Sequence, residues 1–455
     1  MNPTVFLQKG RIYETIIDDL GTRGEGIGKI DGFTVFVPGA LPGEKIRWQA
    51  AEIKKNYAVG ELREILLPSP NRIVPRCSRF PACGGCRLQH LAYDAELALK
   101  QKRVEETLRR VGKIDAPQIL PVKGAADPWR YRNKMQFPVG RDQNKLLIGC
   151  YAAGSHRIID TDECLIQKQG NNEIIAALRQ VVRRCNLSVY DEKNCRGILR
   201  HVVGRVNEAG EIMLVLVTAT ENLPRRSEVI TALRENLPRM IGLQQNIQPD
   251  KSNVIMGSKT KLLWGKATIT EKLGNFVFNI SPRSFFQVNT AQAKILYDTA
   301  REFAALTGRE TLLDAYCGTG TVGLYLATAA KKVIGVEIVA SAVEDARENA
   351  RLNGIENAEF MAGDAAKLMP ELLRSGLKPD VIVLDPPRSG SDETFLAAAA
   401  KMRPARIVYI SCNPATLARD VAFLKNHGYE FGMAQAVDMF PQTMNIETVT
   451  LLTAV

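Results

Sequence analysis

From about residue 270 onward, the chain alternates short apolar runs with segments of helical periodicity. The apolar runs are "TLLDAYC", "KVIGVE", "AEFMAGD", "DVIVLDPP" and "RIVYISC". The segments between them are "TVGLYLATAA", "SAVEDARENARLNG", "TFLAAAAKM" and "ATLARDVAFLKNHG". Strands that alternate with helices pair in parallel, so this pattern predicts an open, doubly wound α/β sheet. Two further strands are expected around "GMAQAVDMF" and "ETVTLLTAV".

The rest of the 455-residue chain is long enough for additional domains. Residues 5–65 contain short alternating strands and glycine turns, including Asp31-Gly32, and this pattern predicts hairpins that form a small β-barrel. Barrels of this kind often bind single-stranded nucleic acid, and a purely structural barrel is the alternative. Residues 93–112 have helical spacing, with Gly112 as the expected C-cap.

The predicted organisation therefore has three domains. Residues 1–66 form the barrel. Residues 67–265 form a central α+β domain that contains a cluster of cysteines. Residues 266–455 form the Rossmann-like α/β domain, on which the helix at 93–112 can pack.

The chain carries 60 Lys and Arg against 49 Asp and Glu, a formal charge of +11. Basic proteins commonly bind nucleic acid, although a basic enzyme without such a partner is the alternative. No apolar run reaches the length of a membrane span, and the N-terminus lacks the apolar region of a signal peptide. We therefore expect a cytoplasmic monomer with no membrane partner, whose nine cysteines are ligands, nucleophiles or core residues.

The segment "DAYCGTGTVG" follows one of the predicted strands and opens a predicted helix. Gly318, Gly320 and Gly323 satisfy G-x-G-x-x-G, which lets the backbone turn tightly and approach a ligand closely. Glu337 ends the next strand, where it could accept hydrogen bonds from ribose hydroxyls. A loop of this type by itself fits NAD, FAD or S-adenosylmethionine equally well.

Two more carboxylates follow the next strands. Asp364 ends the third strand, within reach of an adenine amino group, and Asp385 begins "DPPRSG" after the fourth. Open α/β sheets bind ligands at the carboxyl ends of their strands, where these residues lie. Each acid alone could be a helix N-cap. The order "DxxCGxG", an acidic strand end and then "DPPR" resembles an S-adenosylmethionine-dependent methyltransferase more than a dehydrogenase.

Cys412 in "YISCNP" lies at the end of the fifth strand, beside the expected cofactor site. A lone cysteine is usually inert packing. Methylation of C5 of a pyrimidine needs a thiolate, however, because addition to C6 makes C5 nucleophilic, and a base must later remove the C5 proton. Such a thiol needs a low pKa. Glu447 opens an apolar strand and is the candidate base, since a carboxylate on that face is costly unless it is solvated or paired. An edge residue at the mouth of the strand is the alternative.

Five motifs together resemble the RNA (uracil-5-)-methyltransferases over essentially the whole chain: "FFQVN", "DAYCGTGTVG", "VLDPPRSG", "YISCNP" and "FPQTMNIETV". The resemblance implies that residues 5–65 are a TRAM domain, which is an RNA-binding module. It implies that Cys412 is the nucleophile and Glu447 the base. By the same matching, S-adenosylmethionine would contact Gln287, Tyr316, Glu337, Asp364 and Asp385.

Two positions qualify this resemblance. Asn445 stands where the family often has His, which loosens any claim about a proton relay but leaves Glu447 in place. Arg388 stands where the related RNA cytosine-C5 enzymes usually carry a cysteine, and this difference favours uracil as the target base.

Three cysteines are clustered as C-x5-C-x2-C at Cys77, Cys83 and Cys86. Cys164 is the first choice for a fourth ligand and Cys150 the second. Four thiolates suit zinc or an iron–sulfur cluster, and their spacing does not separate the two. The resemblance favours a [4Fe–4S] cluster on Cys77, Cys83, Cys86 and Cys164, with a structural or RNA-binding role. No role is assigned to Cys185, Cys195 or Cys317.

The thiolate must reach the face of the ring, so the target uridine is expected to be flipped out or to lie in a loop. The segment "WRYRNKMQF" (residues 129–137) interleaves basic and aromatic residues, and Phe285 lies near Gln287; ordinary strands with a charged face are the alternative. We predict a methyltransferase acting on a uridine of 23S ribosomal RNA, because a TRAM-like barrel combined with a cysteine cluster fits that branch. Alternatives are a transfer RNA enzyme of the same chemistry and a non-catalytic RNA-binding protein. A zinc-containing NAD oxidoreductase does not fit "DPPR" and "SCNP".

Overall fold

The computed structural model describes residues 7–455, and these residues form two compact units. The first unit contains the described residues up to Leu99, together with Tyr151–Arg157 and Phe440–Met444. The second contains Lys100–Cys150, Ile158–Met439 and Asn445–Val455. Within the described part of the chain, no helix is both long and apolar enough to cross a membrane.

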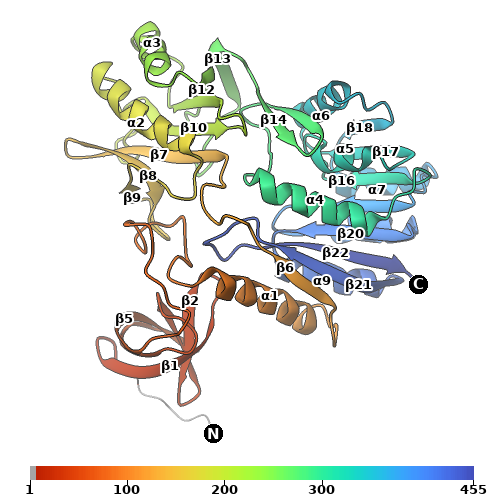
Figure 1. The fold of residues 1–455 in the computed structure, drawn as a ribbon, viewed down its shortest axis with the longest axis horizontal. Coiled ribbons are helices and arrows are strands. Elements are labelled where there is room, and N and C mark those ends of the chain that lie inside the picture. Colours follow the sequence, from red (N-terminus) through yellow and green to blue (C-terminus); the bar gives the residue numbers. More distant parts are fainter. Residues whose placement is uncertain (1–6) are drawn as a thin grey trace. The chain divides into compact units, whose positions relative to one another are not determined.

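The first unit contains a closed barrel with strand order β1-β2-β3-β5-β4 (red in Figure 1). Its strands are β1 (Ile12–Leu20), β2 (Glu25–Ile30), β3 (Phe33–Pro38), β4 (Lys45–Ile53) and β5 (Tyr57–Leu67). Alternate side chains such as Val35, Val37 and Trp48 fill the interior. Asp31 and Gly32 both have positive φ, as a tight β2–β3 hairpin requires. The predicted barrel is confirmed, and residues 1–6 of the predicted segment lie outside the described residues.

Helix α1 (Tyr93–Arg110) follows the cysteine segment and ends two residues before the predicted end. The left-handed residue after it is Lys113, with φ of 52°, and not Gly112. Glycine is still needed at 112, because a Cβ there would lie 2.5 Å from the carbonyl oxygen of Leu108. The predicted C-cap glycine therefore lies in the turn that ends the helix, and the residue with positive φ is the one after it. Val104 and Leu108 of this helix are buried in the core of the α/β sheet described next.

The α/β sheet of the second unit has eight strands in the order β18-β17-β16-β19-β20-β22-β21-β6. The strands β16 (Thr311–Ala315), β17 (Lys332–Glu337), β18 (Ala358–Ala362), β19 (Val381–Leu384) and β20 (Arg406–Ser411) are parallel. β22 (Glu447–Ala454) is antiparallel to both β20 and β21 (Tyr429–Val437). The edge strand β6 (Ile119–Lys123) comes from far earlier in the chain. The doubly wound sheet is confirmed, and β6 was not foreseen.

One helix precedes β16, and the others connect or follow the strands of this sheet. They are α4 (Thr290–Ala304), α5 (Thr321–Ala327), α6 (Ala340–Leu352), α7 (Ala365–Arg374), α8 (Glu393–Lys401) and α9 (Pro414–Lys425). β16 lies between β17 and β19, so the strand order reverses there, and open α/β sheets bind ligands at such a reversal.

A second sheet in this unit has the order β13-β12-β11-β10-β7-β8-β9. Its strands are β7 (Lys134–Asp142), β8 (Lys145–Tyr151), β9 (Ile158–Asp160), β10 (Leu199–Val206), β11 (Ile212–Thr218), β12 (Met240–Ile247) and β13 (Lys259–Gly265). Helices α2 (Gln169–Arg184) and α3 (Arg226–Asn236) pack on one face. A hairpin of β14 (Ile269–Leu273) and β15 (Phe276–Ile280) leads to α4. The predicted division at residues 66 and 265 stays a prediction.

One buried ion pair joins α1 to the end of β21. Lys100 Nζ lies 2.7 Å from Asp438 Oδ1, and both side chains are inaccessible to solvent. The backbone oxygen of Asp438 also accepts a hydrogen bond from Gln292 Nε2 at 3.0 Å. Because a buried charge without its partner is costly, this pair ties three segments together.

We therefore predict that Lys100→Met lowers the free energy of unfolding by about 3–5 kcal/mol, since it removes one partner of a buried ion pair. Urea denaturation followed by circular dichroism measures the loss. Lys401→Met, at an exposed position of α8, is the control and should be neutral. Adding Asp438→Leu to Lys100→Met should recover part of the loss. Equal stability of Lys100→Met and Lys401→Met would contradict the prediction.

Candidate active site

The glycine loop between β16 and α5 turns through residues with positive φ, as predicted for its glycines but not for Tyr316. Tyr316, Gly318 and Gly320 have φ values of 65°, 55° and 79°, so the chain turns sharply before α5. The backbone N–H of Gly323 donates a 2.7 Å hydrogen bond to Asp314 Oδ2. A Cβ at Gly323 would lie 2.7 Å from the same oxygen, so only glycine fits there. Asp314 is buried, and burial raises its pKa to about 8.

The acidic strand ends have different surroundings. Glu337 accepts hydrogen bonds from the backbone N–H groups of Gly318 (3.0 Å) and Val339 (2.9 Å), which fix its carboxylate against the glycine loop. Asp364 is the N-cap of α7 and accepts from the N–H of Ala366 at 3.0 Å. The N-cap alternative therefore describes at least part of the role of Asp364.

The segment before α4 presents successive side chains in opposite directions. Phe285 is 66% exposed, whereas Phe286 is buried and packs its ring 5.9 Å from that of Phe278. Gln287 is buried, and its backbone oxygen accepts a 2.9 Å hydrogen bond from Asn133 Nδ2. Gln287 is thus held in place, whereas the exposed ring of Phe285 is available for stacking.

Cys412 and Glu447 leave the sheet from neighbouring strands. Ser411 of β20 pairs with Thr448 of β22, so the thiol after β20 and the carboxyl group that opens β22 lie at the same edge. Cys412 is partly buried and Glu447 is 4% exposed. Asn413 caps α9 and donates through Nδ2 to the backbone oxygen of Arg388 at 3.0 Å, which joins the "SCNP" and "DPPR" segments.

The surroundings of Cys412 favour the protonated forms of its thiol and of the carboxyl groups of Glu447 and Asp385. Burial is the main cause that raises the pKa of Cys412 from its ordinary value of 9.0 to about 11. Glu447 and Asp385 contribute to this rise, and Arg388 opposes it. Burial, and then Asp385, raises the pKa of Glu447 well above its ordinary range. Burial raises the pKa of Asp385 to about 7. The predicted need for a low thiol pKa is therefore not met in the protein alone, because the site combines burial with neighbouring carboxyl groups.

A buried network that the sequence did not reveal fixes the "DPPRSG" loop. Asp420 Oδ2 accepts hydrogen bonds from Tyr409 Oη (2.6 Å) and the N–H of Ser391 (2.8 Å). A Cβ at Gly390 would lie 2.7 Å from the same oxygen. An aspartate on the buried face of the predicted helix in "ATLARDVAFL" was the available signal, since a buried carboxylate needs partners.

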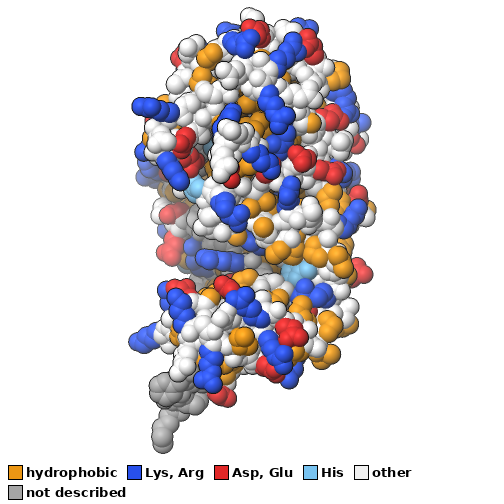
Figure 2. Space-filling view, turned by 90° about the vertical axis from the view of Figure 1, so that its left-hand side faces the viewer, with side chains coloured by type: hydrophobic (Ala, Val, Ile, Leu, Met, Phe, Trp, Pro, Cys, Tyr) orange, Lys and Arg blue, Asp and Glu red, His pale blue; other side chains and the backbone are white. Residues whose placement is uncertain are grey.

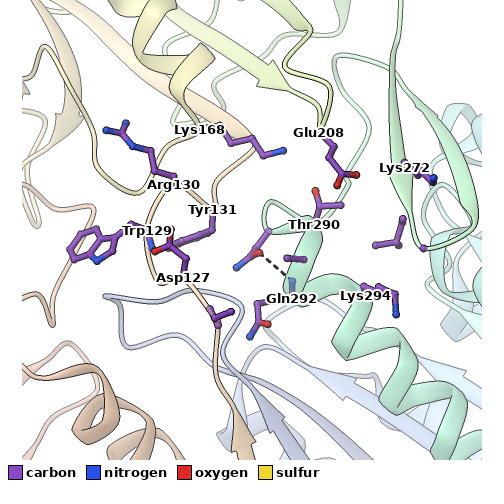
Figure 3. A pocket seen from close by; sticks show the side chains of 16 residues that line it. Asp127, Trp129, Arg130, Tyr131, Lys168, Glu208, Lys272, Thr290, Gln292 and Lys294 are labelled. Carbon is purple, nitrogen blue, oxygen red and sulfur yellow. Dashed lines mark hydrogen bonds between the residues drawn. The ribbon is translucent and has the colours of Figure 1, made fainter.

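The predicted RNA-side segment lies at a cavity of about 620 Å³ in the second unit. Trp129, Arg130 and Tyr131 line it, together with the start of α4 (Figure 3). Four basic side chains and two acidic ones contribute to the lining: Arg130, Lys168, Lys272, Lys294, Asp127 and Glu208. The cavity combines aromatic rings with a net positive lining, which suits a nucleotide.

Further cations lie on the central sheet close to Phe285. Lys134 and Arg205 are cross-strand partners on β7 and β10. Arg205 is 2% exposed and donates through Nη2 to the backbone oxygen of Ser284 at 3.2 Å, while its Nη1 has no partner. Burial, together with Arg205 and Arg132, lowers the pKa of Lys134 to about 7. Lys134, Arg205 and Arg132 repel one another electrostatically, and an anion bound here would reduce that repulsion.

The predicted metal ligands are divided between the two units. Cys77, Cys83 and Cys86 belong to the first unit and Cys164 to the second. Cys83 Sγ accepts a hydrogen bond from the backbone N–H of Gly85 at 3.4 Å, a contact that favours a thiolate. Among residues 7–455, no group of three Cys, His, Asp or Glu side chains is arranged to hold a metal ion. The metal site therefore stays a prediction.

The reversal at β16, the glycine loop and the acidic strand ends define the second unit as an S-adenosylmethionine-dependent methyltransferase. Residues 92–455 match the tRNA (uracil-5-)-methyltransferase family, and residues 7–62 match the TRAM domain. The chain belongs to the tRNA (uracil-5-)-methyltransferase family. It is an S-adenosylmethionine-dependent RNA uracil-5-methyltransferase with a TRAM domain, as its motifs predicted.

Several relatives match over nearly their whole length. An uncharacterized RNA methyltransferase from Halalkalibacterium halodurans is 48% identical over 447 residues, which cover 98% of each chain. One from Clostridium tetani is 46% identical over 454 residues, covering 100% of this chain and 98% of the relative. The crystal structure of Pyrococcus abyssi tRNA (uracil-54, C5)-methyltransferase with S-adenosyl-L-homocysteine superposes with a TM-score of 0.78 at 28% identity. That match covers 97% of this chain and 100% of the other.

The pKa directions predict how Cys412 reacts in the cofactor-free protein. Its alkylation by iodoacetamide should show a midpoint near pH 11, so that at neutral pH it carries about a hundredfold less thiolate than an ordinary thiol. Glu447→Gln should move the midpoint to lower pH by removing a negative charge, and Arg388→Met should move it higher. Peptide mass spectrometry across a pH series measures both shifts.

Cys195 is an internal control in the same experiment. It is exposed, and Lys251 and Tyr190 lower its pKa, so it should react first. Equal reactivity of Cys412 and Cys195 at pH 7 would show that the electrostatic description of the site is wrong.

Proposed function

We propose that the enzyme methylates C5 of a uridine in 23S ribosomal RNA through a covalent bond between Cys412 and C6 of the base. The observation that carries this mechanism is the adjacency of Cys412 and Glu447 across the β20–β22 pair. The remaining site residues are proposed by position and motif: Gln287, Tyr316, Glu337, Asp364 and Asp385 for the cofactor.

The reaction needs a nucleophile and a base in turn. The thiolate of Cys412 adds to C6 of uracil, and the electron pair of the C5–C6 double bond moves to form an enolate. S-adenosylmethionine, when bound, supplies an electrophilic methyl group on a positively charged sulfur. C5 forms the new bond to this methyl group as the methyl–sulfur bond breaks. Glu447 then removes the proton from C5, the double bond re-forms, and the thiolate leaves.

The electrostatics of the site suit this sequence of steps. Glu447 has a pKa far above that of a solvated carboxyl group, so its carboxylate is a stronger base. Asp385, with a pKa of about 7, can exchange a proton at neutral pH. Arg388 lowers the pKa of Cys412, and the positive charge of the cofactor would favour the thiolate in the same way.

The glycine loop fits the proposed cofactor. A Cβ at Gly318 would have no atom within 4 Å, so open space lies over the turn and a ligand can approach the backbone closely. Glu337 is held against this turn by the N–H of Gly318, where its carboxylate can accept hydrogen bonds from ribose hydroxyls.

Two lines of support point to different RNA classes. The combination of a TRAM domain with a cysteine cluster favours ribosomal RNA. The Pyrococcus abyssi relative is a transfer RNA enzyme, which makes transfer RNA the second candidate. Lys and Arg side chains are spread over the face drawn in Figure 2, and either RNA could use them.

The function is tested by methyl transfer from labelled S-adenosylmethionine to unmodified cellular RNA, with ribosomal and transfer RNA separated and nucleosides identified by mass spectrometry. We expect 5-methyluridine in 23S ribosomal RNA with the wild type and the Cys195→Ala control, and none with Cys412→Ala. Label in transfer RNA would make the substrate assignment wrong and leave the chemistry standing.

Glu447→Gln tests separately whether Glu447 is the base that removes the C5 proton. Without the base, the C5 proton stays and the methylated RNA should remain attached to Cys412 as a complex that survives denaturing electrophoresis. Cys412→Ala in the same background should abolish the complex. Full turnover by Glu447→Gln would exclude Glu447 as the base.

We also propose that Cys77, Cys83, Cys86 and Cys164 hold a [4Fe–4S] cluster with a structural or RNA-binding role, and uracil methylation itself requires no electron transfer. The support is the C-x5-C-x2-C spacing and the N–H contact to Cys83 Sγ.

Protein purified without oxygen should contain about four iron atoms per chain and absorb in the visible range. Elemental analysis of the wild type and Cys83→Ser should show the iron lost in the variant and retained in the exposed control Cys195→Ser. Zinc in place of iron would favour the alternative metal. The absence of both metals would refute the site.

A further inference from the structure

The first unit contains a cavity of about 710 Å³ that the methyl-transfer chemistry does not use. Its walls come from the outer surface of the barrel and from the cysteine segment before α1. The side chains on which the argument rests are Arg23, Phe36, Tyr57, Phe80, Arg87 and His90.

Two aromatic rings face outward from adjacent barrel strands. Val35 and Val37 fill the barrel interior, so Phe36 between them points outward, and β3 pairs in parallel with β5, which carries Tyr57. The two rings meet edge to face, with centroids 5.5 Å apart and planes at 85°. Tyr57 is 38% exposed. The barrel core does not need these rings, and exposed aromatic rings on such barrels are surfaces on which bases stack.

A buried histidine with unused hydrogen-bonding groups belongs to the part of the lining that the cysteine segment supplies. His90 is 2% exposed, and neither Nδ1 nor Nε2 has a hydrogen-bond partner. Its ring lies 5.1 Å from that of Phe80. Buried polar atoms are almost always paired in folded proteins, so two unpaired ring nitrogens beside a cavity indicate a polar ligand.

The charges around the cavity favour an uncharged ring over a bare anion. Arg23 and Arg87 are balanced by Glu25 and Glu52, which also line the cavity. A neutral imidazole offers one donor and one acceptor on different sides of its ring, and either nitrogen can pair with a polar group of a nucleobase. The two arginines can then contact the flanking phosphates.

We propose that this cavity binds an unpaired RNA base, distinct from the uridine that is methylated, between the aromatic rings of the barrel and the Phe80–His90 pair. The inference rests on the proposed function for the identity of the RNA. According to this proposal, the TRAM domain and the cysteine segment together recognise a second, unstacked nucleotide.

The proposal is tested with the full-length enzyme and a fluorescent single-stranded RNA of about 20 nucleotides that contains all four bases, with the same sequence as a duplex for comparison. Tyr57→Ala should weaken single-strand binding about tenfold, the typical loss when one base loses its stacking partner. In methyl transfer it should raise KM for RNA and leave kcat unchanged. Ile16→Ala, at a 59% exposed position of β1 outside the cavity, is the matched control and should change neither value.

A second variant and a cross-link complete the test. His90→Phe keeps a ring beside Phe80 but removes both nitrogens, so it should weaken binding of some bases more than others. RNA carrying 5-bromouridine should cross-link on irradiation to Phe36, Tyr57 or Phe80. Wild-type binding by Tyr57→Ala, or cross-links confined to residues outside the cavity, would overturn the inference while methyl transfer stands. Tyr57-dependent binding without any methyl transfer would instead refute the proposed function.

Discussion

The antiparallel register of β22 against β20 is the constraint on which the candidate active site depends. Ser411 opposes Thr448, and this pairing brings a thiol and a carboxyl group to one edge although 35 positions separate Cys412 from Glu447 (447 − 412). A slip of one residue would turn Glu447 toward the other face of the sheet and separate the two groups. The β22–β21 pairing and the ion pair at Asp438 hold this register from the other side.

The same edge concentrates carboxyl groups that cannot all be charged. Asp314, Asp385 and Glu447 each have a raised pKa, with burial as the first cause. A site of this kind is prepared for a cationic ligand, because a positive charge placed among the acids stabilises their ionised forms. The sulfonium of the cofactor carries such a charge, whereas its demethylated product does not.

Local patterns in the sequence predicted much of this arrangement. Each of the parallel strands β16 to β20 is a short apolar run next to a helix signal, so both the fold class and the placement of Cys412 after β20 could be predicted. Features set by distant contacts could not. β6 is only five residues long and contains Pro121, and nothing local indicates that it pairs with β21. The direction in which the pKa of Cys412 is shifted depends on burial and on Glu447. The absence of hydrogen-bond partners at the ring nitrogens of His90 depends on which groups surround the ring.

The position of β6 has a consequence for how the chain folds as it is synthesised. Val104 and Leu108 of α1 belong to the core of the α/β sheet, and β6 forms its edge, yet β21 and β22 are made last. α1 and β6 can therefore complete their contacts with the sheet only after some 300 further residues have been synthesised. Contacts so distant in sequence form slowly. During that interval an apolar helix face and an unpaired strand edge are exposed, and surfaces of this kind favour aggregation.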